Sequence, residues 1–168
     1  PQSALKYGAD LVIQSLHKTL PCLTQTAILH CQGNLVDRER LKRYLQIYQT
    51  SSPSYVFLAA MDQCIEKMKK SGKEMFEKFK RNLEIFRDNT RDLCAIEIPG
   101  EELIGNNGVF AFDFSKLIFS VRKTKRTGKW LQERLRGDYH LELEMASGDY
   151  ALAMTSVADD EEGFRRLE

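Results

Sequence analysis

Three residues near the start of the chain carry polar groups that could do chemistry together. Ser15, His17 and Lys18 supply a hydroxyl, an imidazole and an amine within four residues, directly after a short apolar run. The amine can condense with an aldehyde, and the hydroxyl and the imidazole can bind a phosphate group. Taken alone, the same pattern also fits a solvated lysine and an ordinary hydrogen-bonded histidine in a surface turn.

Two predicted strands flank this segment. Residues 8–15 contain the β-branched pair Val12 and Ile13, and residues 25–31 predict a second strand, with Pro21 breaking regular structure between them. A strand, an irregular turn and a second strand bring polar groups to a sheet edge, where α/β proteins bind ligands. We therefore expect a buried, largely parallel sheet with the lysine at its edge.

Helices are predicted over the next part of the chain. Residues 37–49 repeat apolar side chains at a spacing of three and four, with Asp37 as the N-cap. Residues 55–87 form a longer helical pattern that we expect to be interrupted near Ser71 and Gly72. Its second half gathers one apolar face, which consists of Met75, Phe76, Phe79, Leu83 and Phe86.

The last part of the chain predicts a small α+β domain. Its strands are expected over residues 93–98, 109–114, 141–145 and 150–155, with a helix over 127–136 capped by Thr127 and another from residue 159. The predicted α/β organisation has three parts. Residues 1–72 are the end of a large domain, residues 73–92 a connecting helix, and residues 93–168 the small domain.

The composition is that of a globular protein without an electrostatic preference for polyanions. Of 168 residues, 42% are hydrophobic and 29% charged, and the net charge is +1, which argues against nucleic-acid or membrane partners. No apolar run reaches the roughly 18 residues of a membrane span. The cysteines form no Cys-x-x-Cys pair, and His30 and His140 have no partner at metal-ligand spacing. We expect a cytoplasmic protein with reduced thiols and no bound metal.

The sequence resembles one enzyme family over most of its length. GADLVIQSLHKTLPCLTQTAILH (8–30) resembles the lysine segment of the ornithine/lysine/arginine decarboxylases, which depend on pyridoxal 5'-phosphate and have the aspartate-aminotransferase fold (fold type I). QTSSPSYVFLAAMD (49–62) resembles the next family signature, and TGKWLQERLR followed by LELEMAS resembles the small-domain pattern. Serine hydroxymethyltransferases also carry His-Lys-Thr but continue with a Gly-Pro-rich turn, whereas Leu20-Pro21 follows here and favours the decarboxylases.

The resemblance implies roles for five residues. Lys18 would bond to the cofactor aldehyde, and Ser15 and His17 would contact the cofactor phosphate. Thr50 and Ser51 match a loop that reaches the phosphate of the neighbouring subunit in the family homodimer. A helix-capping turn explains Thr50 and Ser51 equally well.

The reaction implied is the conversion of lysine, ornithine or arginine to the corresponding amine and carbon dioxide, and nothing in the sequence identifies which substrate is used. The family aspartate that pairs with the pyridine nitrogen, in an Asp-x-Ala-His motif, and the histidine that stacks on the ring lie upstream of the lysine segment. We therefore expect a C-terminal piece of the enzyme that is inactive alone. Two alternatives remain: another fold type I enzyme, such as an aminotransferase or a carbon–sulfur lyase, or a non-catalytic interaction module of this fold.

Overall fold

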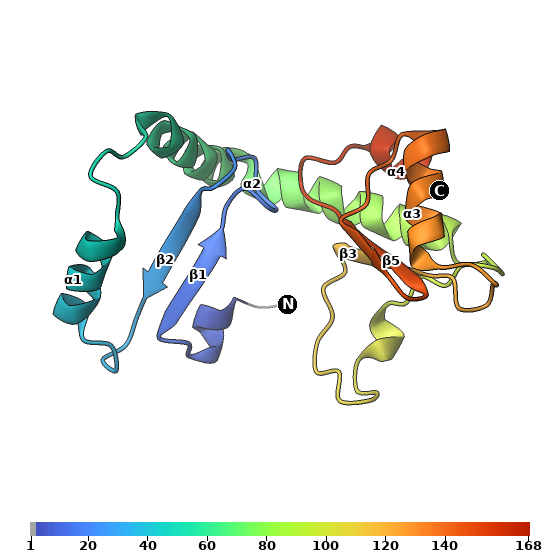
Figure 1. The fold of residues 1–168 in the computed structure, drawn as a ribbon, viewed down its shortest axis with the longest axis horizontal. Coiled ribbons are helices and arrows are strands. Elements are labelled where there is room, and N and C mark those ends of the chain that lie inside the picture. Colours follow the sequence, from blue (N-terminus) through green and yellow to red (C-terminus); the bar gives the residue numbers. More distant parts are fainter. Residues whose placement is uncertain (1–2) are drawn as a thin grey trace. The chain divides into compact units, whose positions relative to one another are not determined.

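The structure is a computed structural model that describes residues 3–168 (Figure 1). The chain divides into two compact units, one ending at Gly72 and the other running from Lys73 to Glu168. Helix α2 (Tyr55–Asn89) contributes its first half to the N-terminal unit and its second half to the C-terminal unit.

The predicted interruption of α2 near Ser71 and Gly72 is wrong, because the helix runs through both residues. One glycine inside a helix costs only about 1 kcal/mol relative to alanine. Ion pairs at a spacing of four support the helix on either side, with Lys70 Nζ 3.0 Å from Glu66 Oε1 and Lys73 Nζ 3.9 Å from Glu77 Oε1.

The N-terminal unit contains a two-stranded sheet. A short 3-10 helix, η1 (Ala4–Tyr7), precedes strand β1 (Leu11–Ser15), which pairs with strand β2 (Ala27–Cys31). The strands are antiparallel, with Leu11 opposite Cys31 and Ser15 opposite Ala27. The prediction of a largely parallel sheet is therefore corrected. The connection spans only residues 16–26, whereas a parallel pair needs a crossover of about a dozen residues or more, usually with a helix.

Helix α1 (Arg38–Tyr48) begins where the sequence predicts. The Asp37 side chain accepts a hydrogen bond of 3.0 Å from the backbone amide of Arg40, which confirms the predicted N-cap. No residue of α1 is fully buried.

The C-terminal unit contains a three-stranded antiparallel sheet with the order β3-β5-β4. Its strands are β3 (Lys116–Ser120), β4 (Met145–Ser147) and β5 (Tyr150–Met154), and helices α3 (Gly128–Tyr139) and α4 (Glu161–Leu167) complete the unit with the short η2 (Glu101–Leu103). The predicted cap Thr127 is confirmed, because its side chain accepts from the amide of Trp130 at 3.1 Å.

The strands predicted over 93–98 and 109–114 are wrong, and β3 was not predicted. Only an isolated bridge between Glu97 and Ser120 forms in the first region. In the second, the aromatic rings pack on a cation: the Arg87 guanidinium lies 5.7 Å from the ring centroid of Phe114 and 6.0 Å from that of Phe112. Arg87 also donates hydrogen bonds to the carbonyls of Pro99 (3.1 Å) and Phe114 (3.4 Å). The two segments are therefore held by contacts with the Arg87 side chain and do not pair as strands.

The hydrophobic core of the C-terminal unit is centred on Phe86 of α2, which is completely buried. Its ring centroid lies 6.4 Å from that of Phe119 on β3 and 6.0 Å from that of Phe164 on α4. Phe79 and Leu83 share this buried face, as predicted, whereas Phe76 is 49% exposed and does not belong to the core.

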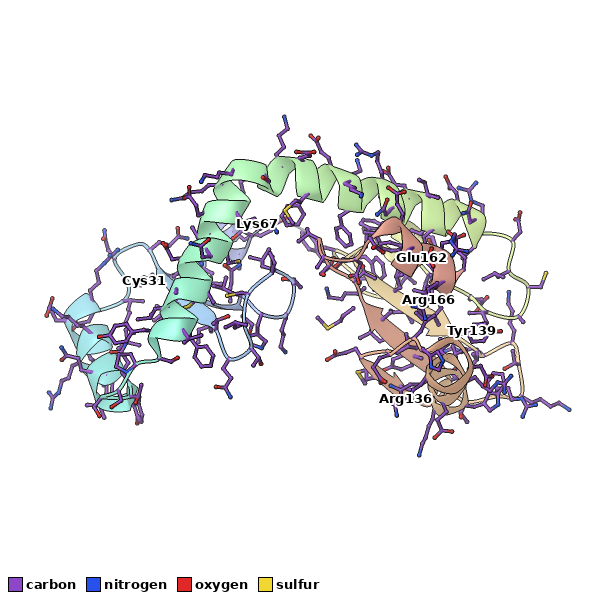
Figure 2. All side chains as sticks on the ribbon, turned by 90° about the horizontal axis from the view of Figure 1, so that it is seen from above. Cys31, Lys67, Arg136, Tyr139, Glu162 and Arg166 are labelled. Atoms are coloured by element: carbon purple, nitrogen blue, oxygen red, sulfur yellow. The ribbon has the colours of Figure 1, made fainter. Side chains whose placement is uncertain are left out.

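A polar contact joins the two helices that follow β3 and β5. Arg166 on α4 donates hydrogen bonds to the carbonyl oxygens of Tyr139 and His140 at the end of α3. Figure 2 labels Arg166 and Tyr139. His140 itself has a φ of 54°, so this left-handed residue ends α3 and turns its carbonyl toward the arginine. The last turn of α3 is thereby held against α4.

Two glycines of α3 differ in the space around them, and alanine is therefore expected to change the stability in opposite directions at the two positions. A Cβ on Gly128 would lie 1.8 Å from the carbonyl oxygen of Tyr150, whereas a Cβ on Gly137 of the same helix would meet nothing within 4 Å. Gly128→Ala should lower the free energy of unfolding by about 2 kcal/mol or more, because backbone must move. Gly137→Ala should raise it by roughly 0.5–1 kcal/mol.

Urea unfolding followed by circular dichroism measures both glycine variants under one set of conditions. Equal stabilities of the two variants would contradict the close approach of β5 to the start of α3.

Candidate functional site: the lysine loop

Residues 16–26, called the lysine loop below, connect β1 to β2 and carry His17 and Lys18. The loop is closed at its base, because the amide of Leu16 donates to the carbonyl of Thr26 over 3.0 Å. Inside it, the amide of Leu20 donates to the carbonyl of Leu16 (3.0 Å) and the amide of Cys22 to that of Leu20 (2.8 Å). Eleven residues without regular structure are thus held by local backbone bonds.

Thr26 is the residue on which the loop closes. It is only 2% exposed, and its hydroxyl donates to the carbonyl of Leu23 at 2.7 Å and contacts Cys22 Sγ at 3.1 Å. Its carbonyl oxygen accepts from His17 Nδ1 at 3.0 Å in addition to the amide of Leu16. One buried threonine therefore fixes the backbone and the histidine ring together.

The bond to Thr26 also decides which nitrogen of His17 is available to a ligand. A carbonyl oxygen can only accept, so Nδ1 carries a proton and the ring is held with Nε2 directed away from that contact. His17 is half-buried, which leaves part of the ring at the surface. Nε2 is therefore the ring nitrogen that the bond to Thr26 leaves for the predicted phosphate contact.

Ser15 and Lys18 lie on either side of this histidine with exposed side chains. Ser15 ends β1 opposite Ala27, and Lys18 lies in the turn that follows. The three predicted residues lie on one short segment because they are neighbours in sequence, and whether their side chains act at one site stays a prediction.

Thr50 and Ser51 lie in the linker between α1 and α2 and are exposed. The Thr50 hydroxyl accepts from the amide of Ser52 at 3.2 Å, and the Ser54 hydroxyl accepts from the amide of Phe57 at 3.4 Å at the start of α2. These are local turn and cap bonds. Within residues 3–168, neither Thr50 nor Ser51 forms a hydrogen bond to the lysine loop.

Helix α2 carries a buried thiol. Cys64 is 2% exposed, whereas Cys22 of the lysine loop is half-buried, and both are free cysteines. Burial raises the pKa of the Cys64 thiol and Cys22 raises it further, while Lys67, labelled in Figure 2, acts in the opposite direction.

Thr26 and Cys64 are the residues that sequence reasoning missed. Thr26 is the one polar residue at the head of the apolar run 26–29, and a hydroxyl at that place is a signal for a buried hydrogen bond. Cys64 gave no signal, because its burial depends on packing that the neighbouring residues in sequence do not indicate. In the part of the chain that the structure describes, no group of His, Cys, Asp or Glu could hold a metal ion, and no helix is long and apolar enough to span a membrane.

Comparison with known proteins identifies the family. Residues 1–127 match the family model described as Orn/Lys/Arg decarboxylase, major domain. The chain therefore belongs to the Orn/Lys/Arg decarboxylase family, whose members are pyridoxal-phosphate-dependent decarboxylases.

Curated relatives match nearly the whole chain. It is 30% identical over 161 residues to an arginine decarboxylase of Bacillus anthracis, covering 96% of this chain and 33% of that protein. It is 29% identical over 167 residues to an arginine decarboxylase of Bacillus subtilis, covering 99% of this chain and 34% of that protein. The chain thus spans about a third of the length of the curated relatives that it matches.

A solved structure has a similar fold. The crystal structure of the Francisella novicida lysine decarboxylase superimposes with a TM-score of 0.78 at 17% identity, covering 94% of this chain and 26% of that one. The mixed α/β fold with small antiparallel sheets is therefore that of part of a lysine decarboxylase.

The closure of the lysine loop predicts the effect of removing one hydroxyl. Thr26→Val keeps the shape of the side chain but loses the bonds to Leu23 and Cys22, which are worth about 1 kcal/mol. The amide of Leu16, whose acceptor is the carbonyl of the same residue, should then exchange with deuterium about fivefold faster. Hydrogen exchange read by NMR measures this rate.

Thr24→Val is the matched control, because Thr24 is exposed in the same loop, and the exchange of Leu16 should remain unchanged. An unchanged rate in the Thr26 variant would show that the hydroxyl does not hold the loop.

Proposed function

We propose that this chain carries the cofactor lysine of a pyridoxal-phosphate-dependent decarboxylase of basic amino acids, and that Lys18 is the attachment residue. The observation that supports this most directly is the fixed ring of His17 beside the exposed amine of Lys18. Membership of the Orn/Lys/Arg decarboxylase family supplies the class of reaction.

The donor set of the segment fits the cofactor. An amine matches the aldehyde, and a hydroxyl together with an imidazole matches the phosphate. When bound, pyridoxal phosphate supplies a ring that withdraws electrons from the substrate carbon that loses its carboxylate. Ser15 and His17 would hold the phosphate, and Lys18 would bind the aldehyde carbon covalently and release it to the substrate amine.

The bond between His17 and Thr26 sets how the imidazole can act. Nδ1 is occupied by the carbonyl of Thr26, so Nε2 donates to a phosphate oxygen only when the ring carries both protons. The ring is then a cation facing an anion, which makes the hydrogen bond charge-assisted. His17 would in this way position the phosphate while Thr26 prevents the ring from turning.

Arginine is the first substrate to test. The relatives at 29% and 30% identity are named arginine decarboxylases, whereas the solved structure with a similar fold is a lysine decarboxylase at 17% identity. We propose a homodimer for the full-length enzyme, with Thr50 and Ser51 directed to the phosphate site of the neighbouring subunit. Their exposed, locally bonded turn is compatible with that role.

The covalent role of Lys18 predicts a single site of labelling. The full-length protein treated with pyridoxal phosphate and then with borohydride should carry the reduced cofactor on the peptide that contains Lys18. Lys18→Ala should abolish this label, whereas Lys6→Ala, which removes an exposed lysine of the same unit, should keep it. Peptide mass spectrometry makes the measurement, and a label at another lysine, or none, would refute the assignment.

A second prediction concerns the 168-residue chain by itself. It contains no Asp-x-Ala-His motif, and the resemblance places in that motif the carboxylate that keeps the ring nitrogen protonated. Without it the electron demand of the ring falls, so the purified chain should release no carbon dioxide from arginine, lysine or ornithine above the protein-free rate. Carbon dioxide release by the chain alone would contradict this.

Product analysis on the full-length protein separates the alternatives. An amine with carbon dioxide supports the decarboxylase, and a keto acid supports an aminotransferase. A full-length protein that gives no cofactor absorbance with pyridoxal phosphate would favour a non-catalytic module.

A further inference from the structure

A groove in the C-terminal unit contains one arginine without a charged partner. Among residues 3–168, Arg87 of α2 forms no ion pair, although its side chain is half-buried in the wall of this groove. A charge that is partly withdrawn from water is costly unless an opposite charge meets it, so we expect an anion at this guanidinium. The other four cations of the wall each pair with a carboxylate: Lys80 with Glu84, Arg91 with Asp88, Arg122 with Asp149, and Lys123 with Glu97.

The guanidinium of Arg87 is held in a fixed orientation. It lies against the rings of Phe112 and Phe114, and two of its N–H groups donate hydrogen bonds to the carbonyls of Pro99 and Phe114. Its Nε–H is buried and has no acceptor in the described part of the chain. The remaining N–H groups are therefore preorganised for an acceptor that the described residues do not supply, and a carboxylate is the acceptor that an arginine fork binds best.

A carboxylate lies beside this cation, over Gly100. Glu102 Oε1 accepts a hydrogen bond of 2.7 Å from the amide of Gly100, which fixes the side chain. A Cβ on Gly100 would lie 3.2 Å from Arg87 Nη1 and 3.3 Å from Glu102 Oε2, so these two atoms approach the same point above the bare Cα. Arg87 and Glu102 thus present opposite charges to the same part of the groove without forming an ion pair within residues 3–168.

We propose that Arg87 and Glu102 bind the head group of a free α-amino acid, with its carboxylate at Arg87 and its ammonium at Glu102. An anion alone would be repelled by Glu102 and a cation alone by Arg87, whereas a zwitterion is attracted by both. The side chain of the ligand would lie along the apolar part of the wall, which includes Ile98, Leu103 and Phe114. An apolar amino acid such as leucine therefore suits the groove. The site uses no residue of the lysine loop, so it does not rest on the proposed function.

Titration of the isotope-labelled chain with L-leucine, followed by NMR, tests the site. We expect saturable shifts of the Gly100 amide and of the Arg87 Nε–H signal. Isocaproate lacks the amine of leucine, and isoamylamine lacks its carboxylate. Each should bind about tenfold more weakly than leucine, because each makes only one of the two charged contacts. The absence of a saturable shift with leucine, or equal binding of leucine and either analogue, would overturn the proposal.

Two glutamate variants separate the ammonium contact from a general effect of charge. Glu102→Gln keeps the size of the side chain and an acceptor for the Gly100 amide, and it should weaken leucine binding about tenfold. Glu101→Gln is the matched control, because it removes the same charge from the adjacent exposed residue, and it should bind leucine like the unchanged protein. Unchanged binding by the Glu102 variant, or equal losses in both variants, would refute the contact with the ammonium group.

A glycine variant tests the arginine without removing its charge or its contacts with the carbonyls of Pro99 and Phe114. Gly100→Ala places a methyl group against Arg87 Nη1 and Glu102 Oε2, so both must shift and leucine should bind more weakly. Unaltered leucine binding in this variant would count against a head group held at Gly100. Labelling of Lys18 by pyridoxal phosphate is a separate measurement, so the failure of leucine binding would leave the proposed function unchanged.

Discussion

The carbonyl oxygen of Thr26 is the point on which the candidate site depends. It accepts from the amide of Leu16, which closes the loop, and from the ring of His17, which fixes the imidazole. A buried carbonyl needs at least one donor, and this one has two, so the strand pair and the histidine are set by the same group. The ends of the loop that carries Lys18 cannot separate without exposing the Thr26 carbonyl oxygen.

The two units are stabilised by different kinds of interaction. The C-terminal unit has a packed core, in which Phe86 contacts the aromatic rings of a strand and a helix that lie far apart in sequence. The N-terminal unit buries few apolar side chains and holds its loop through backbone bonds and one buried threonine. Hydrophobic packing therefore stabilises the C-terminal unit, and directional polar contacts define the candidate site in the N-terminal unit.

The polar contacts of the candidate site would suit the charged, covalently held cofactor that we propose. A fixed imidazole and an accessible amine require no reorganisation of the backbone before they act, which is the form of preorganisation that a cofactor site needs. Orientation of the proposed reactive amine would thus be a property of one eleven-residue connection.

Local features could be predicted from the amino-acid sequence, because they depend on residues that are close along the chain. The helix starts at Asp37 and Thr127 could be predicted, because each depends on one side chain and the amide three residues further along. The segment with Ser15, His17 and Lys18 was identified from its residue types alone. The antiparallel pairing of β1 with β2, the strand β3 and the closure of the lysine loop at Thr26 could be known only from the folded chain. Each of these joins groups that are distant along the chain, and no pattern within one segment states which distant segment will satisfy it.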